Sequence, residues 1–542
     1  MYVRKTTIED LPAMLEIYAE AREFMKNTGN PTQWITYPEK ELLVSDIEAD
    51  RSYVVIQDQA VCGTFVFTLG EDEAYKVIEG SWLNDRPYGV IHRLAGTKEK
   101  GIFDCAVEFC LSKVCDLRVD THNDNRVMQS ILEKRGFTKC GIIYLKDDMS
   151  DHSPRIAYQY SSCKDKLDCG GCLYQDLSYE KQLKVKEKEV RRELEKRNVC
   201  PENFDSIHGC DNILHYRNKM EYTFGNVVKD GPLTLGMHKK GSYISIITVD
   251  DCMLVHNDFN IILDAVLDFA KEKDYAFYHK KAHTGILRNL IIRQGIRTDE
   301  LLVNIVTTSD DFAEDEFRDL ILSLKLENKV VGILRTLDDN IADMVRCEGL
   351  HILYGRDYYM EKVCNLDFKV SAFSFFQTNV PAVEKLYMDA ISLLSDIDNK
   401  TVFDLYSGTG TISQIVSPHA KEVFGIEINP DAVKTAKENA ELNNLTNCNF
   451  ICGDVFKELE KLEVKPDVIV VDPPRVGLEP KALEKIISYG VPEIVYISCN
   501  PKTLCENLMA FEMNGYRVKY MKPYDNFPFT KHIESIVLLT KN

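Results

Sequence analysis

Basic residues are outnumbered in this sequence, which has 66 Lys and Arg against 85 Asp and Glu and a formal net charge of −19. Binding to nucleic acid through overall charge needs a basic surface, so the composition argues against that class of protein but leaves room for a local basic groove. Long apolar runs are missing as well. None approaches the roughly 20 residues of a membrane span, and the opening MYVRKTTIED has no apolar core of the kind that signal peptides carry.

Regular cysteine spacing is also missing, because the 17 cysteines follow no repeating pattern. Without a secretion signal, this usage indicates a reducing, cytoplasmic location in which thiols stay free or bind metal. The 542 residues exceed what one hydrophobic core can serve. We therefore predict three domains, at residues 1–160, 161–370 and 371–542, and we expect a monomer that does not bind membranes.

Two predicted strands are followed by residues of types that act in catalysis, a cysteine and an aspartate. The apolar run at residues 494–497 leads into Ser-Cys499-Asn-Pro, where proline ends the strand. The run at residues 468–471 leads into Asp472-Pro-Pro-Arg475. The carboxyl ends of parallel strands share one crevice. A cysteine taken alone is more often a buried apolar residue, but this setting favours Cys499 as a nucleophile.

A glycine-rich loop, DLYSGTGT at residues 404–411, lies between an apolar run and a helical pattern. Dinucleotide-binding loops read G-x-G-x-x-G, but Ser413 stands at the third glycine, which disfavours a nicotinamide cofactor. S-adenosylmethionine (SAM) has no pyrophosphate and needs a shorter glycine loop. Glu427 ends the next predicted strand, where a carboxylate accepts ribose hydroxyls, and Asp454 ends the one after, near the adenine. This order predicts a Rossmann-like SAM-binding domain.

The pairing of Asp472-Pro-Pro-Arg475 with Cys499 favours carbon methylation of a pyrimidine. Amino methylation of a base usually places an aromatic residue after the prolines, where Arg475 stands. C5 of uracil is a poor nucleophile until a thiolate adds to C6. A base must then remove H5 before the thiol leaves. Glu534, beside His532 at the start of the last predicted strand, is the candidate base.

Three cysteines follow a predicted linker in the order C-x5-C-x2-C, within CKDKLDCGGCLYQ. They are Cys163, Cys169 and Cys172, and Cys252 follows a later strand as a candidate fourth ligand. Glycines beside cysteines leave room for thiolates to converge on an iron–sulfur cluster. Zinc also takes four thiolates, and unliganded thiols are a third interpretation, which the unusual spacing disfavours.

DPPR, SCNP and the tail FP-x-T-x-H-x-E together resemble the RNA 5-methyluridine (uracil-C5) methyltransferase family, and the cysteine spacing resembles its iron–sulfur members. The resemblance covers residues 163–542. It implies that Cys499 is the nucleophile, that Glu534 is the base, and that Cys163, Cys169, Cys172 and Cys252 hold a [4Fe-4S] cluster. With the glycine loop, it places the following residues around SAM and the uracil: Gln377, Tyr406, Gly408, Gly410, Thr411, Glu427, Asp454 and Asp472.

Two departures from the family bear on the choice of RNA. Phe529 stands where the family usually has a polar residue or tyrosine, and the small RNA-binding β-barrel that many members carry is replaced by a different domain. Because cluster-bearing members mostly act on 23S rRNA, we expect that substrate, with a tRNA uridine as the alternative. A non-catalytic RNA-binding or assembly protein is the rival class, which intact Cys499 and Glu534 disfavour. The RNA backbone is expected beside basic strand starts at Arg217, Lys219, Lys239, Lys240 and Arg288.

The first 160 residues resemble the GNAT family of N-acetyltransferases, most closely at residues 125–137. The family's pyrophosphate loop fits loosely, with Lys98 and Gly101 in place but Phe103 at its last small position. We therefore expect weak or no binding of acetyl-CoA, with Tyr144 as candidate general acid or as a core tyrosine, and an acetyltransferase activity as an open alternative. The predicted fold class is α/β, with a GNAT-like domain, a mixed α+β iron–sulfur and RNA-binding domain, and a Rossmann-like SAM methyltransferase domain.

Overall fold

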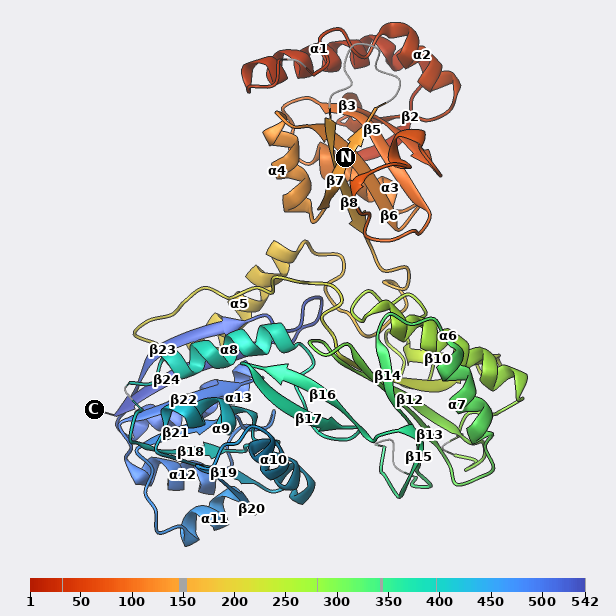
Figure 1. Cartoon of the computed structure of the whole chain (residues 1–542). Helices are drawn as coiled ribbons and strands as arrows, with labels where there is room; N and C mark the ends of the chain where they lie inside the picture. The colour runs from red at the N-terminus through yellow and green to blue at the C-terminus, as the bar shows by residue number, and fades with distance from the viewer. Residues whose placement is uncertain (32, 146–153, 280, 342–344, 396, 542) are drawn as a thin grey trace. The chain divides into compact units, whose positions relative to one another are not determined.

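The computed structural model describes residues 1–31, 33–145, 154–279, 281–341, 345–395 and 397–541 (Figure 1). Its contacts divide the chain into two compact units, Met1–Lys166 and Leu167–Asn542. The predicted boundary near residue 370 lies inside the second unit and remains a prediction. Among the helices described, none is both long and apolar enough to cross a membrane.

The first unit is built on an eight-stranded sheet in the order β1-β2-β3-β5-β6-β8-β7-β4. Strands β5 and β6 run parallel, and helix α3, between them in the sequence, packs its apolar side on the sheet. The strands are Tyr2–Lys5, Ser52–Gln57, Ala60–Leu69, Glu79–Gly80, Tyr88–Gly96, Asp116–His122, Thr138–Tyr144 and Pro154–Ser161 (β1 to β8), and the α-helices are Leu11–Asn27, Lys40–Glu48, Ile102–Leu111 and Arg126–Arg135 (α1 to α4).

The second unit begins with α5 (Tyr179–Arg197) and a seven-stranded sheet in the order β11-β10-β9-β12-β13-β14-β15. Helices α6 (Asn257–Glu272) and α7 (Glu314–Ser323) contribute to its core. Helix α6 buries residues at the spacing of one helix face, which explains why it lies flat on the sheet. The strands are Lys219–Asn226, Leu233–His238, Ile246–Thr248, Leu287–Gly295, Glu300–Thr307, Lys329–Leu337 and Gly349–Gly355 (β9 to β15). The hairpin Tyr358–Val363 and Leu366–Ser371 (β16, β17) follows.

The remaining sheet has the order β20-β19-β18-β21-β22-β24-β23, with five parallel strands and an antiparallel β24. Its strands are Thr401–Leu405, Glu422–Glu427, Cys448–Cys452, Val468–Val471, Glu493–Ser498, Tyr516–Tyr524 and Glu534–Lys541 (β18 to β24), and its helices are Val380–Ser392, Thr411–Val416, Pro430–Leu442, Val455–Lys461, Pro480–Tyr489 and Pro501–Met513 (α8 to α13). The order reverses between β18 and β21, and ligands of such sheets bind at that point. The predicted Rossmann-like fold is confirmed.

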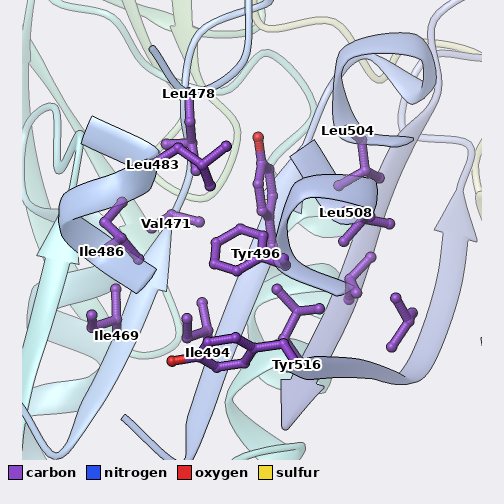
Figure 2. Close-up of a cluster of buried hydrophobic side chains, with 14 of the residues drawn as sticks. Ile469, Val471, Leu478, Leu483, Ile486, Ile494, Tyr496, Leu504, Leu508 and Tyr516 are labelled. Carbon is purple, nitrogen blue, oxygen red and sulfur yellow. The ribbon is translucent and has the colours of Figure 1, made fainter. Parts of the chain in front are cut away.

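Helices α12 and α13 hold the ends of β21 and β22 in place. Figure 2 shows Leu483 of α12 and Leu504 of α13 on either side of the buried Tyr496 of β22. The Tyr496 hydroxyl donates to Asn507 Oδ1 at 2.8 Å, and the same oxygen accepts from the backbone N–H of Leu478 at 2.9 Å. The strand ends that carry Asp472 and Cys499 therefore rest on a packed apolar layer.

Candidate active site

The glycine loop after β18 makes a tight turn. Tyr406, Gly408 and Gly410 all have positive φ, at 67°, 53° and 75°. A side chain at Gly410 would meet the ring of Phe450, because an added Cβ lies 2.6 Å from Cζ. An added Cβ at Gly408 has no neighbour within 4 Å, so the loop is open on that side. Its backbone can thus come close to a ligand, as a SAM loop requires.

Two carboxylates, Asp404 and Glu427, accept hydrogen bonds from the glycine loop and from the helix that follows it. Buried Asp404 accepts from the Ser413 N–H at 2.9 Å and from its hydroxyl at 2.5 Å. Burial raises the pKa of Asp404 to about 6, although the Ser413 bonds oppose the shift. Glu427, at the end of β19, accepts from the Gly408 N–H at 3.1 Å and the Asn429 N–H at 2.8 Å. These bonds orient its carboxylate while leaving it half-buried.

The other predicted cofactor residues lie at the same edge of the sheet or next to it. Asp454 follows β20 and caps α11, accepting from the Lys457 N–H at 3.1 Å. Thr411 is the first residue of α9. Gln377 lies in the segment before α8, and its side chain hydrogen-bonds to buried Tyr387. Acceptors at the ends of β19 and β20, beside an open glycine turn, fit the hydroxyls and adenine of SAM.

The pairing of β22 with β24 brings Cys499 close to Glu534. Ser498 of β22 pairs with Ser535 of β24 in antiparallel register. Cys499 directly follows β22 and Glu534 begins β24, so both lie at this end of the paired strands, and the charge of Glu534 acts on the Cys499 thiol. Burial raises the pKa of the Cys499 thiol to about 11, with Glu534 and Asp472 adding to the shift and Arg475 opposing it. The nucleophile candidate is therefore a protonated thiol at neutral pH in the free protein.

Two carboxyls, Asp472 and Glu534, share this crevice with Cys499. Burial, then the charge of Asp404, raises the pKa of Asp472 to about 7. Burial, then the charge of Asp472, raises the pKa of Glu534 well above its usual value, and Arg475 opposes the shift. A buried carboxyl whose neutral form is favoured becomes a stronger base once ionised, which suits a group that must remove a proton from carbon.

Arg475 is the residue here that sequence reasoning undervalued. Its backbone carbonyl accepts from Asn500 Nδ2 at 2.8 Å and from Thr503 Oγ1 at 3.2 Å, so the two strand-end loops are tied together. Its Nη2 lies 3.4 Å from Nδ1 of His532. Burial, then Arg475, lowers the pKa of His532 to about 4, which keeps that imidazole neutral at neutral pH. Arg475 is the cation that favours the charged forms of both Cys499 and Glu534.

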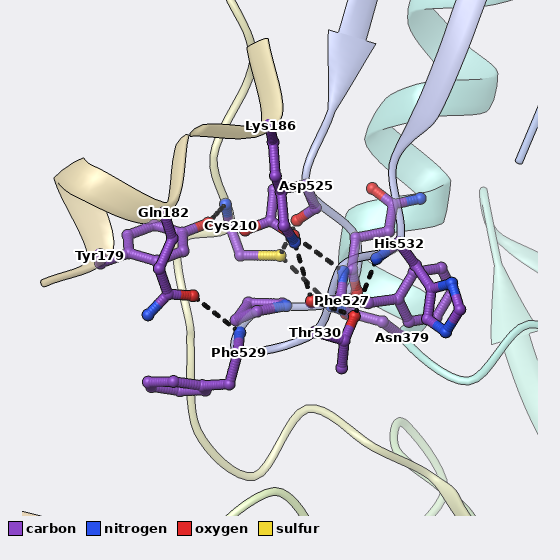
Figure 3. A network of polar contacts seen from close by, with 12 residues as sticks. Tyr179, Gln182, Lys186, Cys210, Asn379, Asp525, Phe527, Phe529, Thr530 and His532 are labelled. Carbon is purple, nitrogen blue, oxygen red and sulfur yellow. Dashed lines mark hydrogen bonds and ion pairs between the residues drawn. The ribbon is translucent and has the colours of Figure 1, made fainter. Parts of the chain in front are cut away.

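A buried ion pair fixes the loop that leads to Glu534 (Figure 3). Lys186 of α5 donates to Asp525 Oδ1 at 2.5 Å and to the Phe527 carbonyl at 3.0 Å, and the Lys186 and Asp525 side chains are fully buried. The N–H of Phe529 donates to Gln182 Oε1 at 2.8 Å. Phe529 has a φ of 65°. The turn is thus held through its backbone and by helix α5, which starts more than 300 residues earlier.

The sequence family described as tRNA (Uracil-5-)-methyltransferase matches residues 178–542. The chain belongs to this family. It is 49% identical over 374 residues to an uncharacterized RNA methyltransferase of Clostridium tetani, with 69% of this chain and 82% of that protein covered. A similar protein of Clostridium acetobutylicum is 47% identical over 380 residues, with 70% and 83% covered.

The family's fold is also found among solved structures. The crystal structure of Pyrococcus abyssi tRNA (uracil-54, C5)-methyltransferase with S-adenosyl-L-homocysteine matches with a TM-score of 0.57 and 24% identity, covering 74% of this chain and 94% of that one. The chain is a SAM-dependent RNA methyltransferase, so the predicted enzyme class and family are confirmed. The matched region starts at residue 178 and leaves the GNAT-like and cysteine-loop predictions untested.

The predicted metal ligands lie in both units of the chain. Cys163 belongs to the first unit, whereas Cys169, Cys172 and Cys252 belong to the second. Cys172 and Cys252 pack in one small apolar cluster with Tyr216. Throughout the part of the chain that the structure describes, no three or more His, Cys, Asp or Glu side chains are grouped to hold a metal ion. The cluster assignment therefore rests on sequence spacing.

The residues predicted to act in the first unit lie near the start of α3 and at the end of β7. Gly101 precedes α3 with a φ of 94°. The ring of Phe103 packs against Phe137, with centroids 6.3 Å apart, so it belongs to the core side of the helix. Tyr144 is exposed, its hydroxyl donates to Glu79 at 3.1 Å, and this bond raises its pKa. It is not a core tyrosine.

Removing the buried ion pair between Lys186 of α5 and Asp525 should lower the stability of the protein. We expect Lys186→Met to lower the free energy of unfolding by about 3–5 kcal/mol, because it leaves the Asp525 carboxylate buried without its cation. Urea denaturation followed by circular dichroism measures the change. Lys184→Met, on an exposed side of the same helix, is the matched control and should shift stability by less than about 0.5 kcal/mol. An equal loss in both variants would contradict the assignment.

Proposed function

We propose that this enzyme methylates C5 of a uridine in RNA through a covalent adduct between Cys499 and C6 of the uracil. The observation that carries the proposal is the pairing of β22 with β24, which brings a thiol and a buried carboxyl to the same end of the two strands at the crevice edge. Both side chains lie at the carboxyl end of a Rossmann-like sheet, beside a glycine loop that fits SAM.

The proposed reaction has three steps at the uracil ring. The Cys499 sulfur forms a bond to C6, and the electron pair of the C5–C6 double bond moves toward O4 as an enolate. C5 then takes the methyl group, and SAM, when bound, supplies that group as an electrophile. Finally Glu534 removes the proton from C5, the C5–C6 double bond re-forms, and the C6–S bond breaks to release the thiolate.

The thiol must lose its proton before it can attack. Because burial and two carboxyls hold the pKa of Cys499 high, the attack requires either a local base or a shift in the balance of charges when RNA binds. Asp472, whose pKa is raised to about 7, is the neighbouring group whose ionisation lies nearest neutral pH. We propose Asp472 as the first acceptor of the thiol proton, with Arg475 favouring the thiolate.

The residues proposed to bind SAM lie at or after the carboxyl ends of β18, β19 and β20. We propose that the backbone of Gly408 and Gly410 approaches the methionine part of SAM. Glu427 then accepts the ribose hydroxyls and Asp454 lies by the adenine. Thr411 begins the helix behind the loop, and Tyr406, Gln377 and Asp472 complete the side that faces the uracil.

We propose 23S rRNA as the substrate, with a tRNA uridine as the alternative. The resemblance of C-x5-C-x2-C to the cluster-bearing members supports rRNA. The matching experiment is mass spectrometry of nucleosides from rRNA and tRNA of a strain that lacks the gene. Loss of 5-methyluridine at one 23S rRNA position supports the proposal, and loss in tRNA supports the alternative. Unchanged 5-methyluridine in both contradicts the function.

We further propose that Cys163, Cys169, Cys172 and Cys252 bind a [4Fe-4S] cluster. Protein purified without oxygen should then be brown, with broad visible absorption and about four iron atoms per chain. Cys172→Ser should lose the iron, whereas Cys200→Ser, at an exposed cysteine elsewhere, should keep it. Colourless protein with one zinc per chain would contradict the cluster.

For the first unit we propose, on the sequence pattern alone, a GNAT-like domain that binds acetyl-CoA weakly or not at all, with an acetyltransferase activity as the alternative. The ring of Phe103, which stands at the last small position of the loop pattern, packs against Phe137. Tyr144 remains the candidate acid, because its hydroxyl is exposed.

A further inference from the structure

A cleft of about 330 Å³ lies in the second unit, between the start of strand β9 and the segment that precedes α8. Its walls include three cations, one carboxylate and two phenyl rings, namely Arg217, Lys219, Arg293, Glu221, Phe373 and Phe375. We call it the cationic cleft. None of the six belongs to the residues assigned above to Cys499 chemistry or to SAM.

The cationic cleft holds positive charge without matching negative charge. Lys219 Nζ lies 3.7 Å from Glu221 Oε2, which leaves two of the three cations uncompensated among the lining residues. Burial, then the charge of Arg293, lowers the pKa of Lys219. An anion in the cleft would relieve this repulsion, and phosphate is the anion that clustered Arg and Lys side chains commonly bind.

Arg293 is built into the wall rather than lying on the surface. Its side chain is 2% exposed. Its Nη2 donates to the Ser374 carbonyl at 2.7 Å, and its Nε has no hydrogen-bond partner among the residues described. The hydroxyl of buried Tyr359 also interacts with Arg293. A buried cation held by neutral groups is costly, so an anion in the cleft would stabilise it.

Exposed rings stand beside these cations. Phe375 is 72% exposed and Phe373 is 41% exposed, although Phe376 between them and α8 is buried. Large apolar rings exposed next to Arg and Lys are the combination that binds single-stranded nucleic acid, where bases stack and phosphates meet cations. The rings therefore add a base-binding element to a phosphate-binding one.

The same segment borders the catalytic crevice. Asn218, between two of the cations, donates from Nδ2 to the Gln377 carbonyl at 3.1 Å and from its backbone N–H to the Thr378 carbonyl at 2.9 Å. The Gln377 side chain bonds to Tyr387, whose pKa responds to Asp472 and Glu534. A strand of RNA in the cationic cleft would thus lie within reach of the crevice.

We infer that the cationic cleft binds one nucleotide of the substrate RNA close in sequence to the methylated uridine, with its phosphate among Arg217, Lys219 and Arg293 and its base against Phe375. The inference rests on the proposed function and gives the RNA a defined path to Cys499. It also corrects the expectation that all the basic strand starts meet RNA. Arg288 is buried and donates to the carbonyls of Asp338 and Asn340, so it does not reach RNA.

The test measures RNA affinity directly. A fluorescein-labelled oligouridine of about 15 nucleotides, the size of a single-stranded site, is titrated with full-length protein at several salt concentrations without SAM. Arg217→Gln should weaken binding roughly tenfold and reduce the slope of log affinity against log salt by roughly 0.7. Phe375→Ala should also weaken binding roughly tenfold, with the slope unchanged, and Phe375→Trp should restore it.

Matched controls make the same changes at exposed residues outside the cleft. They are Lys465→Gln and Tyr243→Ala, and Tyr243 is 94% exposed. Both should keep the wild-type affinity within twofold. Unchanged RNA affinity in Arg217→Gln and Phe375→Ala would overturn the inference that the cationic cleft binds RNA. Equal losses of affinity in the controls would overturn it as well. Covalent trapping of wild-type protein on 5-fluorouridine RNA with SAM separates the two proposals, because its failure refutes the proposed function whatever the affinities are.

Discussion

Replacing Cys499 with alanine is expected to abolish methylation of RNA, by roughly 10⁴-fold or more, and to leave no covalent RNA adduct. Without the sulfur nothing adds to C6, so C5 stays too weak a nucleophile to take a methyl group. The measurement is transfer of labelled methyl from SAM to RNA, followed by nucleoside analysis. RNA affinity should stay near that of the wild type, since alanine removes one partly buried thiol.

Cys200→Ala is the control for loss of a thiol, because Cys200 is exposed and lies outside the crevice. It should methylate at the wild-type rate. If Cys499→Ala still forms 5-methyluridine, the covalent route is wrong.

Glu534→Gln is expected to stop the reaction at a different point. The amide cannot accept the C5 proton, but Cys499 can still add to C6, so methylated RNA should stay bonded to the protein. Turnover should fall by roughly 10²–10⁴-fold, and the adduct should appear as a slow band in denaturing gels. Stability should not fall, because glutamine is of similar size and carries no charge to repel Asp472 in the buried crevice.

Glu484→Gln on the exposed side of α12 is the matched control and should neither slow turnover nor accumulate adduct. Normal turnover in Glu534→Gln would remove Glu534 as the base. Loss of both turnover and adduct would instead assign Glu534 to an earlier step.

Local features of the site could be predicted from the sequence. Apolar runs and the prolines after them gave the ends of β21 and β22 within one residue, and so the positions of Asp472 and Cys499. The glycine loop gave the start of α9, because positive φ and a close approach to Phe450 both demand glycine at position 410. These signals depend on neighbours in the chain, which a sequence displays directly.

Long-range partners could not be predicted in the same way. The register of Ser498 with Ser535 depends on the path of β23 and its loop, and the Lys186–Asp525 pair joins residues 339 positions apart. Lys186 lies in a helix rich in Lys and Glu, so its sequence pattern is that of a solvated face, yet this one lysine is buried. Arg293 likewise lies in an apolar strand that gives no sign of the cleft.

The most direct test of the covalent mechanism is mass spectrometry of wild-type protein after incubation with SAM and RNA that contains 5-fluorouridine. Fluorine cannot leave C5 as a cation, so the last step is blocked and the adduct persists. The account predicts a peptide that carries a methylated 5-fluorouridine nucleotide on Cys499. Methylation of ordinary uridine RNA by the same preparation, with no adduct on Cys499 in the fluorinated RNA, would contradict it.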